Sequence, residues 1–144
     1  MKGFLVCAGA LVLVASCKGA TEPARVRELG VVAGYRDGDP QITLRTAGRT
    51  VYVSVLTYGG GCESKGETES VVRGLEAEIR PYDYTVVAGT VCTSELKVFA
   101  HEAALEFRQS GTARVRIYGI DNRGRTAQEP LGDTITVERT MVLP

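Results

Sequence analysis

Apolar and polar residues alternate along several short segments, and this period of two restricts the chain to β-strands. In residues 51–56, three valines at odd positions alternate with Tyr52, Ser54 and Leu56. The same alternation occurs over 75–80 and 113–118. Successive side chains of a strand point to opposite faces, so each segment has one face for a core and one for water. No window has an apolar stripe with the period of a helix. The sequence therefore predicts an all-β domain.

Turn-forming residues separate the alternating segments and set their number. Glycine, proline, aspartate and asparagine gather between the segments, as in Asp37-Gly38-Asp39-Pro40, Gly59-Gly60-Gly61 and Asn122-Arg123-Gly124. Strands are predicted at 26–35, 42–45, 51–58, 67–73, 75–80, 103–108, 113–120 and 134–142, and the pattern of 67–73 is the weakest. One helical turn is an alternative within 94–104. Seven or eight short strands spaced in this way predict a single β-sandwich over residues 26–144.

The first 17 residues have the layout of an export signal. Lys2 precedes an uncharged apolar run over 4–15, and small residues then lead to Cys17. The run is too short to span a membrane as a helix, which takes about 20 residues. The junction Val14-Ala15-Ser16-Cys17 resembles the lipobox of bacterial lipoproteins. This resemblance implies that residues 1–16 are removed and that Cys17 carries lipid. The alternative is an ordinary secretory signal.

The resemblance also implies a location outside the cytoplasm, on a bacterial membrane. Lys18 follows the cysteine, and by the sorting rule of the family this implies the outer membrane if the host has one. Residues 17–25 contain Gly19 and Pro23 and are predicted to be a short linker. Eight extended residues reach at most about 26–29 Å, so the domain is expected to stay close to the bilayer.

Charge excludes nucleic acid as a partner. Lys2 is the only charged residue of the predicted signal, and its removal leaves 16 basic against 17 acidic side chains. A nucleic-acid-binding domain normally has a basic excess, which this chain lacks. No cluster of basic residues follows Cys17 to strengthen membrane attachment. The membrane is therefore expected to be contacted through the lipid on Cys17.

Two cysteines remain for the domain once Cys7 is removed and Cys17 is acylated. In an oxidising compartment, Cys62 and Cys92 are expected to form a disulfide. The alternative is a small metal-binding or redox site in which these cysteines join His101, with Glu63 as a fourth ligand. That set lacks the C-x₂-C spacing of structural zinc sites, and no cofactor is predicted.

Residues 110–124 suggest the type of sandwich. The segment has a glycine-containing turn, an alternating strand and then Asp121-Asn122-Arg123-Gly124. It resembles the F strand and F–G turn of immunoglobulin-like domains in bacterial surface proteins, with 134–142 as the last strand. The chain departs from the antibody pattern because it has no tryptophan and its cysteines are placed in loops. The resemblance implies an immunoglobulin-like sandwich with a disulfide that clamps loops.

No motif in the chain predicts catalysis. Ser94 and Lys97 have the S-x-x-K spacing of penicillin-binding proteins, but the Ser-Asp-Asn and Lys-Thr-Gly elements of that chemistry are missing. The glycine run before Cys62 lacks the lysine of a phosphate-binding loop and is predicted to form a turn. Asp37-Gly38-Asp39 is predicted to be a β-turn, and His101 a polar or packing residue near Cys92.

Exposed positions offer two further predictions. The charges of Glu76, Glu78, Arg80, Arg114 and Arg116 alternate along two strands and would form cross-strand ion pairs if these strands are neighbours. Tyr58, Tyr82 and Tyr84 are predicted to form a binding surface near the Cys92 loop, for a carbohydrate or an envelope protein. The predicted function is a non-enzymatic binding or structural module of the cell envelope.

Overall fold

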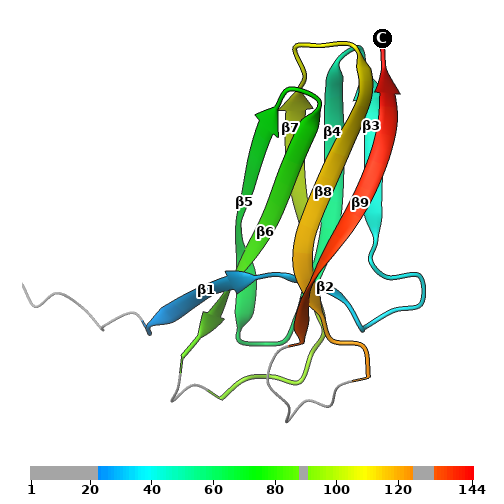
Figure 1. The fold of residues 1–144 in the computed structure, drawn as a ribbon. Helices are drawn as coiled ribbons and strands as arrows, with labels where there is room; N and C mark the ends of the chain where they lie inside the picture. Colours follow the sequence, from blue (N-terminus) through cyan, green and yellow to red (C-terminus); the bar gives the residue numbers. More distant parts are fainter. Residues whose placement is uncertain (1–22, 88–90, 125–131) are drawn as a thin grey trace, which may run out of the picture.

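The computed structural model describes residues 23–87, 91–124 and 132–144, and these residues form strands and no helix (Figure 1). The predicted signal, Cys17 and most of the linker lie outside the described residues. Within the described ranges, no helix is long and apolar enough to cross a bilayer. The nine strands are β1 (Arg25–Leu29), β2 (Val31–Ala33), β3 (Ile42–Ala47), β4 (Thr50–Gly59), β5 (Glu63–Arg73), β6 (Glu76–Val86), β7 (Lys97–Glu106), β8 (Gly111–Asp121) and β9 (Asp133–Leu143).

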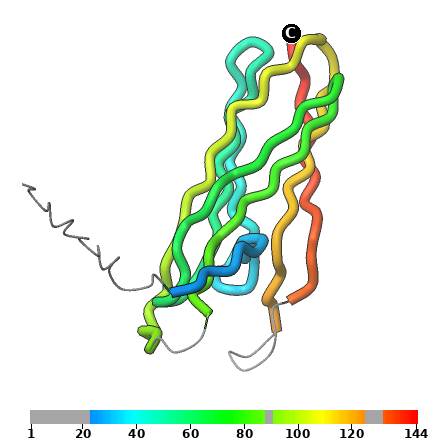
Figure 2. Tube along the Cα trace, turned by 90° about the vertical axis from the view of Figure 1, so that its left-hand side faces the viewer, coloured from blue at the N-terminus to red at the C-terminus, as the bar shows by residue number. Residues whose placement is uncertain are grey.

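The strands stack in two layers, which confirms the predicted β-sandwich (Figures 1 and 2). One layer, the front sheet, has the order β5-β6-β8-β9, and the other, the rear sheet, has the order β7-β4-β3. Strands β6 and β8 run parallel, and the other neighbours within each layer are antiparallel. The short strand β2 pairs with β4 of the rear sheet and β8 of the front sheet.

The alternating residues form the core between the layers, as the sequence predicts. Val51, Val53 and Val55 of β4 are buried against Ala113, Val115 and Ile117 of β8 in one cluster, which also contains Ala77 and Ile79 of β6. Burying an aliphatic side chain of this size contributes roughly 1.5–3 kcal/mol. One inward row from each of three strands thus supplies most of the core.

The prediction of a single strand over 26–35 is wrong, because the strand is interrupted at Gly30 and continues as a second strand. Strand β1 pairs with β6, whereas Val31 of β2 pairs with Tyr58 and Ile120. A Cβ atom at Gly30 would lie 2.7 Å from the Oδ2 of Asp83 and 2.9 Å from the Cβ of Thr57. Only glycine allows so close an approach of the backbone. The segment therefore passes from the front sheet to a position between the two sheets.

Three other predicted boundaries differ from the structure. The helical turn considered within 94–104 is wrong, because residues 97–106 pair with β4 along their whole length. Strand β5 extends the weak prediction at 67–73 back to Glu63, and it contains a bulge between Lys65 and Thr68. Strand β6 continues to Val86, so Tyr82 and Tyr84 lie in a strand, not in a loop.

The predicted ion pairs form on the outer face of the front sheet, where β6 and β8 are neighbours. Across the two strands, the Nη1 of Arg116 lies 3.0 Å from the Oε2 of Glu76. Arg80 instead pairs with Glu78 of its own strand, with its Nη2 2.9 Å from the Oε2 of Glu78. Glu138 of β9 joins them, with its Oε1 3.2 Å from the Nε of Arg114. Each cross-strand pair contributes roughly 0.2–1 kcal/mol, so they stabilise this face only modestly.

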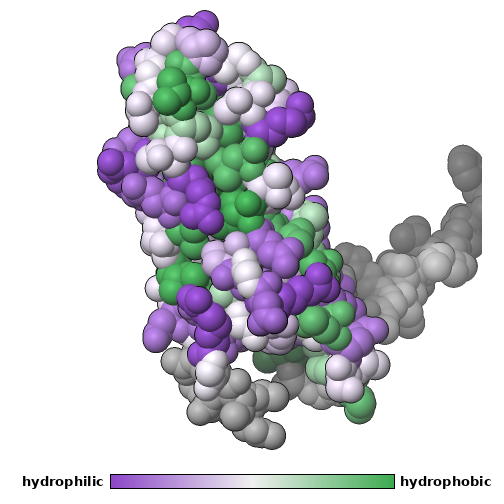
Figure 3. Space-filling view, turned by 90° about the vertical axis from the view of Figure 1, so that its right-hand side faces the viewer, coloured by the Kyte–Doolittle hydropathy of each residue, from purple (hydrophilic) through white to green (hydrophobic). Residues whose placement is uncertain are grey.

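The sandwich has one open long edge, between β3 and β9. Figure 3 views this side and shows apolar side chains along its length. Ile42 of β3 and Ile135 and Met141 of β9 pack against the core here and are only partly buried. Arg139 pairs with the fully buried Val115 and so belongs to the inward row of β9, yet it is exposed. An inward-pointing charge on an edge strand discourages the pairing of another strand there.

Candidate functional site

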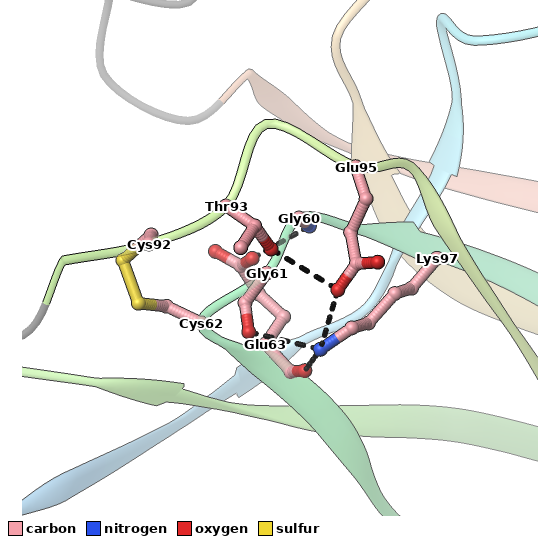
Figure 4. Close-up of a disulfide and its surroundings, with 8 residues drawn as sticks. All are labelled: Gly60, Gly61, Cys62, Glu63, Cys92, Thr93, Glu95 and Lys97. Carbon is pink, nitrogen blue, oxygen red and sulfur yellow. Dashed lines mark hydrogen bonds and ion pairs between the residues drawn. A yellow bond between two sulfur atoms is a disulfide. The ribbon is translucent and has the colours of Figure 1, made fainter.

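A disulfide joins Cys62 and Cys92 at one end of the sandwich, as the sequence predicts (Figure 4). The two Cα atoms are 5.1 Å apart. Cys62 lies in the turn between β4 and β5, and Cys92 lies in the segment that leads to β7. The bridge therefore fixes the turn between β4 and β5 to the segment that leads to β7.

Hydrogen bonds around the disulfide hold the glycine run in place (Figure 4). Gly61 N–H donates to the carbonyl of Thr93 at 3.1 Å, and Gly60 N–H donates to the carboxylate of Glu63 at 2.6 Å. Lys97 Nζ donates to the Gly61 carbonyl at 2.9 Å. A Cβ atom at Gly61 would collide with Thr93. The glycines thus allow two backbone segments to approach, which agrees with the predicted turn.

The metal and redox alternative finds no support in this geometry. Both sulfur atoms are bonded to each other, and both ring nitrogens of His101 face other side chains. In the part of the chain that the structure describes, no group of three or more histidine, cysteine, aspartate or glutamate residues is placed to hold a metal ion.

His101 lies at the centre of a buried polar network that the sequence does not reveal. Its ring is fully buried, and its Nε2 lies 3.1 Å from the Oδ1 of Asp83 on β6. Because a carboxylate only accepts hydrogen bonds, the Nε2 donates. The Nδ1 lies 3.0 Å from the hydroxyl of Thr68 on β5. A hydroxyl both donates and accepts, so Thr68 satisfies this nitrogen in either protonation state of the ring. The network links β5 and β6 of the front sheet to β7 of the rear sheet.

The order Asp83, His101, Thr68 resembles a catalytic triad in its distances, but not in its access. A triad histidine takes the proton of the nucleophile and then delivers it to a leaving group, so the ring must reach substrate. The side chain of His101 has no exposed surface, and that of Asp83 has 9%. The ring therefore reaches no substrate atom. The network connects β5 and β6 to β7 through side chains.

Tyr58, one of the three tyrosines predicted to bind a ligand, is buried. It retains only 2% of its surface, because the ring of Tyr35 packs 5.5 Å away and the 34–41 loop covers it. Its hydroxyl donates to the Oδ1 of Asp39 at 2.7 Å. Burial first, and then the hydrogen bond to Asp39, raise the pKa of Tyr58 to about 12. Tyr58 thus holds the loop onto β4.

The raised pKa of Tyr58 predicts a loss of stability at alkaline pH. The unfolded chain releases this proton near pH 10, two pH units below the folded state, so folding is favoured fully below pH 10. We expect the free energy of unfolding to fall as the pH rises from 10 towards 12. Tyr58→Phe should flatten most of this decrease and lower stability at pH 8 by about 1 kcal/mol. Urea unfolding at pH 8–11.5 tests this.

The control for that experiment is Tyr52→Phe, a change on an exposed ring of the same strand. This variant should lose as much stability as the wild-type protein when the pH rises from 10 towards 12. Some decrease will persist in Tyr58→Phe, because the pKa of Tyr84 is also raised, chiefly by its hydrogen bond to Glu67. An unchanged pH profile in Tyr58→Phe would contradict the assignment.

Tyr82 and Tyr84 lie apart from Tyr58, on the outer face of the front sheet. The guanidinium of Arg27 stacks 3.4 Å above the ring of Tyr82, and it also pairs with Glu67 and Glu69. The Tyr84 hydroxyl donates to Glu67 at 2.8 Å. The three tyrosines therefore form no common surface, and the two outer rings are engaged within the domain.

The outer face of the rear sheet carries a hollow that the sequence does not predict. Its volume is about 440 Å³, and its lining comes from β3, β4 and β7: Thr43, Arg45, Tyr52, Val53, Ser54, Glu102, Ala103 and Ala104. Tyr52 is 41% exposed, and the guanidinium of Arg45 lies 4.6 Å from its ring centre. Small alanine and serine side chains beside a large ring create the depression. We define these eight residues as the rear-face hollow.

Comparison with known proteins assigns no family to this arrangement. No protein-family model matches the chain, and neither a curated protein nor a solved structure matches it.

Proposed function

We propose that the protein is a lipid-anchored, non-enzymatic module of a bacterial cell envelope that binds a ligand in the rear-face hollow. The lipobox-like junction at Cys17 supports the anchor, and the hollow supports binding. We also propose that the sandwich is of the immunoglobulin-like type. The segment 110–124 supports this, because its alternating part is β8 and an antiparallel last strand, β9, follows its turn.

The observation that carries the binding proposal is the contrast between the two outer faces. On the front sheet, ion pairs connect β6, β8 and β9, and Arg27 covers Tyr82. On the rear sheet, Tyr52 keeps 41% of its surface exposed although Arg45 stacks on one side of its ring, and it stands beside small side chains in a depression. Ligand sites are concave, with apolar walls and a few polar groups that orient the ligand. The rear-face hollow has this composition.

A glycan matches the chemistry of the rear-face hollow. A sugar ring can pack against the exposed aromatic ring of Tyr52, which offers contact area at little entropic cost. The hydroxyls of Thr43 and Ser54 and the carboxylate of Glu102 are hydrogen-bond partners for sugar hydroxyls. Arg45, whose side chain lies over the same ring, supplies guanidinium donors.

The position of the first strand of the domain also supports access to the hollow. Strand β1 begins at Arg25, beside Val86 at the end of β6, and Val86 N–H donates to the Cys62 carbonyl. The proposed anchor is eight residues before Arg25, so the disulfide end would face the membrane. Tyr52 lies near the start of β4, whereas the disulfide follows the end of this strand. The hollow would thus lie on the half of the domain away from the bilayer.

Photo-crosslinking in cells tests this proposal. We expect a photoreactive residue at Ala104, an exposed position in the hollow, to form a ligand adduct. The matched control is the same residue at Val71, which is 39% exposed on the outer face of the front sheet. Tyr52→Ala should remove most of the Ala104 adduct, because truncating a central aromatic contact commonly costs more than 1 kcal/mol of binding energy.

The same samples test the anchor. The intact mass of the membrane-extracted protein should correspond to a chain that starts at Cys17 and carries acyl groups. Equal adducts at both positions, or none at either, would contradict a ligand site in the hollow and favour a purely structural envelope protein. A mass without acyl groups would contradict the anchor alone, so the two parts of the proposal fail separately.

A further inference from the structure

We propose that a second site, at the end of the sandwich remote from the disulfide, binds an oxyanion group, carboxylate or phosphate, through Arg49 and Arg108. This site is separate from the rear-face hollow and does not depend on the ligand proposed there. Arg49 lies in the turn between β3 and β4, and Arg108 follows the end of β7. Both turns lie at the end of the molecule that also carries the carboxyl terminus (Figure 1).

Two hydrogen bonds hold the arginine-bearing turns together. Phe107 N–H donates to the carbonyl of Arg49 at 3.0 Å. The Nη1 of Arg49 in turn donates to the carbonyl of Arg108 at 2.9 Å. The side chain of Arg49 is therefore fixed beside the backbone of Arg108 before any ligand arrives. A positioned donor loses less conformational entropy on binding than a freely moving one.

The two arginines line one hollow of about 690 Å³. Its other lining residues are Val72, Gly74, Glu106, Phe107 and Gln109. Phe107 is 4% exposed and belongs to the core cluster, so this part of the hollow is anchored to the core. Gln109 adds an amide donor beside the arginines. The hollow thus combines a floor anchored to the core with charged and neutral hydrogen-bond donors.

The charges of these two arginines are not neutralised within the described part of the chain. Arg27, Arg80, Arg114, Arg116 and Arg123 each lie within 4 Å of a carboxylate oxygen. No such pair involves Arg49 or Arg108 among the residues that the structure describes, although Glu106 lines the same hollow. Arg108 therefore keeps its guanidinium donors for an external partner, and Arg49 keeps those that do not bond the Arg108 carbonyl.

Guanidinium chemistry gives the class of ligand. The planar guanidinium presents parallel N–H donors that match the two oxygens of a carboxylate or a phosphate, and charge-assisted bonds of this kind are about twice as strong as neutral ones. Two guanidiniums beside one hollow therefore favour a ligand with more than one negative oxygen. Carboxylate and phosphate share this chemistry, and the experiment separates them.

Calorimetric titration of the membrane-extracted mature protein with citrate and with tripolyphosphate tests the site. We expect at least one probe to bind at 150 mM salt, and Arg108→Gln to weaken that binding at least tenfold. The Arg108 side chain makes no hydrogen bond or ion pair in the described structure, so this variant should fold normally. Arg49→Lys keeps the charge but loses the planar fork, and should give an intermediate loss.

The matched control is Arg36→Gln, in the 34–41 loop at the disulfide end, because the guanidinium of Arg36 also pairs with no carboxylate in the described structure. It should leave the affinity unchanged. Binding of citrate alone identifies a carboxylate site, and binding of tripolyphosphate alone identifies a phosphate site. Absence of binding by both probes, or equal affinities of the wild-type and Arg108→Gln proteins, would overturn the proposal. Crosslinking at Ala104 should be the same in Arg108→Gln, so failure here leaves the rear-face hollow untouched.

Discussion

Replacing His101 with alanine should destabilise the domain by about 3–5 kcal/mol, the largest effect expected of any single substitution considered. The ring fills a fully buried position and donates to Asp83, whose other carboxylate oxygen has no partner within the described structure. Without the ring, a buried carboxylate loses its hydrogen bond and a cavity opens between β6 and β7. Domains of this size have a total stability of about 5–15 kcal/mol. Urea unfolding at neutral pH measures the loss.

Two further variants distinguish the contribution of the hydrogen-bond network to stability from that of side-chain packing. Thr68→Val removes only the hydroxyl from the Nδ1 side and should cost about 1–3 kcal/mol. Glu102→Ala, an exposed neighbour of His101 on the same strand, should change stability by less than about 0.5 kcal/mol. If His101→Ala cost no more than Glu102→Ala, the network would have no role in holding the two sheets together.

Removing the disulfide should have the next largest effect. Cys62 and Cys92 are 30 residues apart, and closing a loop of this length stabilises a fold by about 3.5 kcal/mol in the chain-entropy model. The double variant Cys62→Ser, Cys92→Ser should therefore lower the melting temperature by about 10–15 °C. Thermal unfolding followed by circular dichroism measures this shift.

The wild-type protein under reducing conditions is the control for the double variant. It should show the same decrease, whereas the double variant should not respond to reductant. If the double variant lost less than about 1 kcal/mol of its free energy of unfolding, the hydrogen bonds of Gly60, Gly61 and Lys97 would fix the turn without the bridge.

Strand positions were predictable where one face of a strand is buried. The valines at 51, 53 and 55 and the row 113, 115 and 117 are buried as their alternation indicates. The pattern fails at 94–104, because strand β7 contains buried His101 and outward-facing alanines, which a helix accommodates equally well. Pairing with the distant strand β4 decides the conformation there. A sequence window does not contain that partner.

The site residues were less predictable, because their roles depend on pairs that are distant in the chain. Asp83 gives no sequence signal, since its partner His101 is on another sheet. Tyr58 resembles an exposed tyrosine near a loop, but the 34–41 loop returns to cover it. The rear-face hollow needs the register of three strands, which sets Arg45, Tyr52 and Ala104 in one row. The disulfide was predictable because only two cysteines remain once Cys7 and Cys17 are assigned to the proposed signal and anchor.

The position of β1 and β2 in the fold has a consequence for the order in which the protein folds. Val31 pairs with Tyr58 and with Ile120, and Arg25 pairs with Val86, so the first two strands complete their pairing only after much of the chain is present. Contacts of such long sequence separation form slowly, because a large loop must close before they contribute. If the chain is exported amino end first, as the proposed anchor implies, the apolar segment Val31–Ala33 would have only the first of its two strand partners, β4, until β8 has emerged. The apolar segment close to the proposed anchor would therefore complete its pairing late, only once β8 is present.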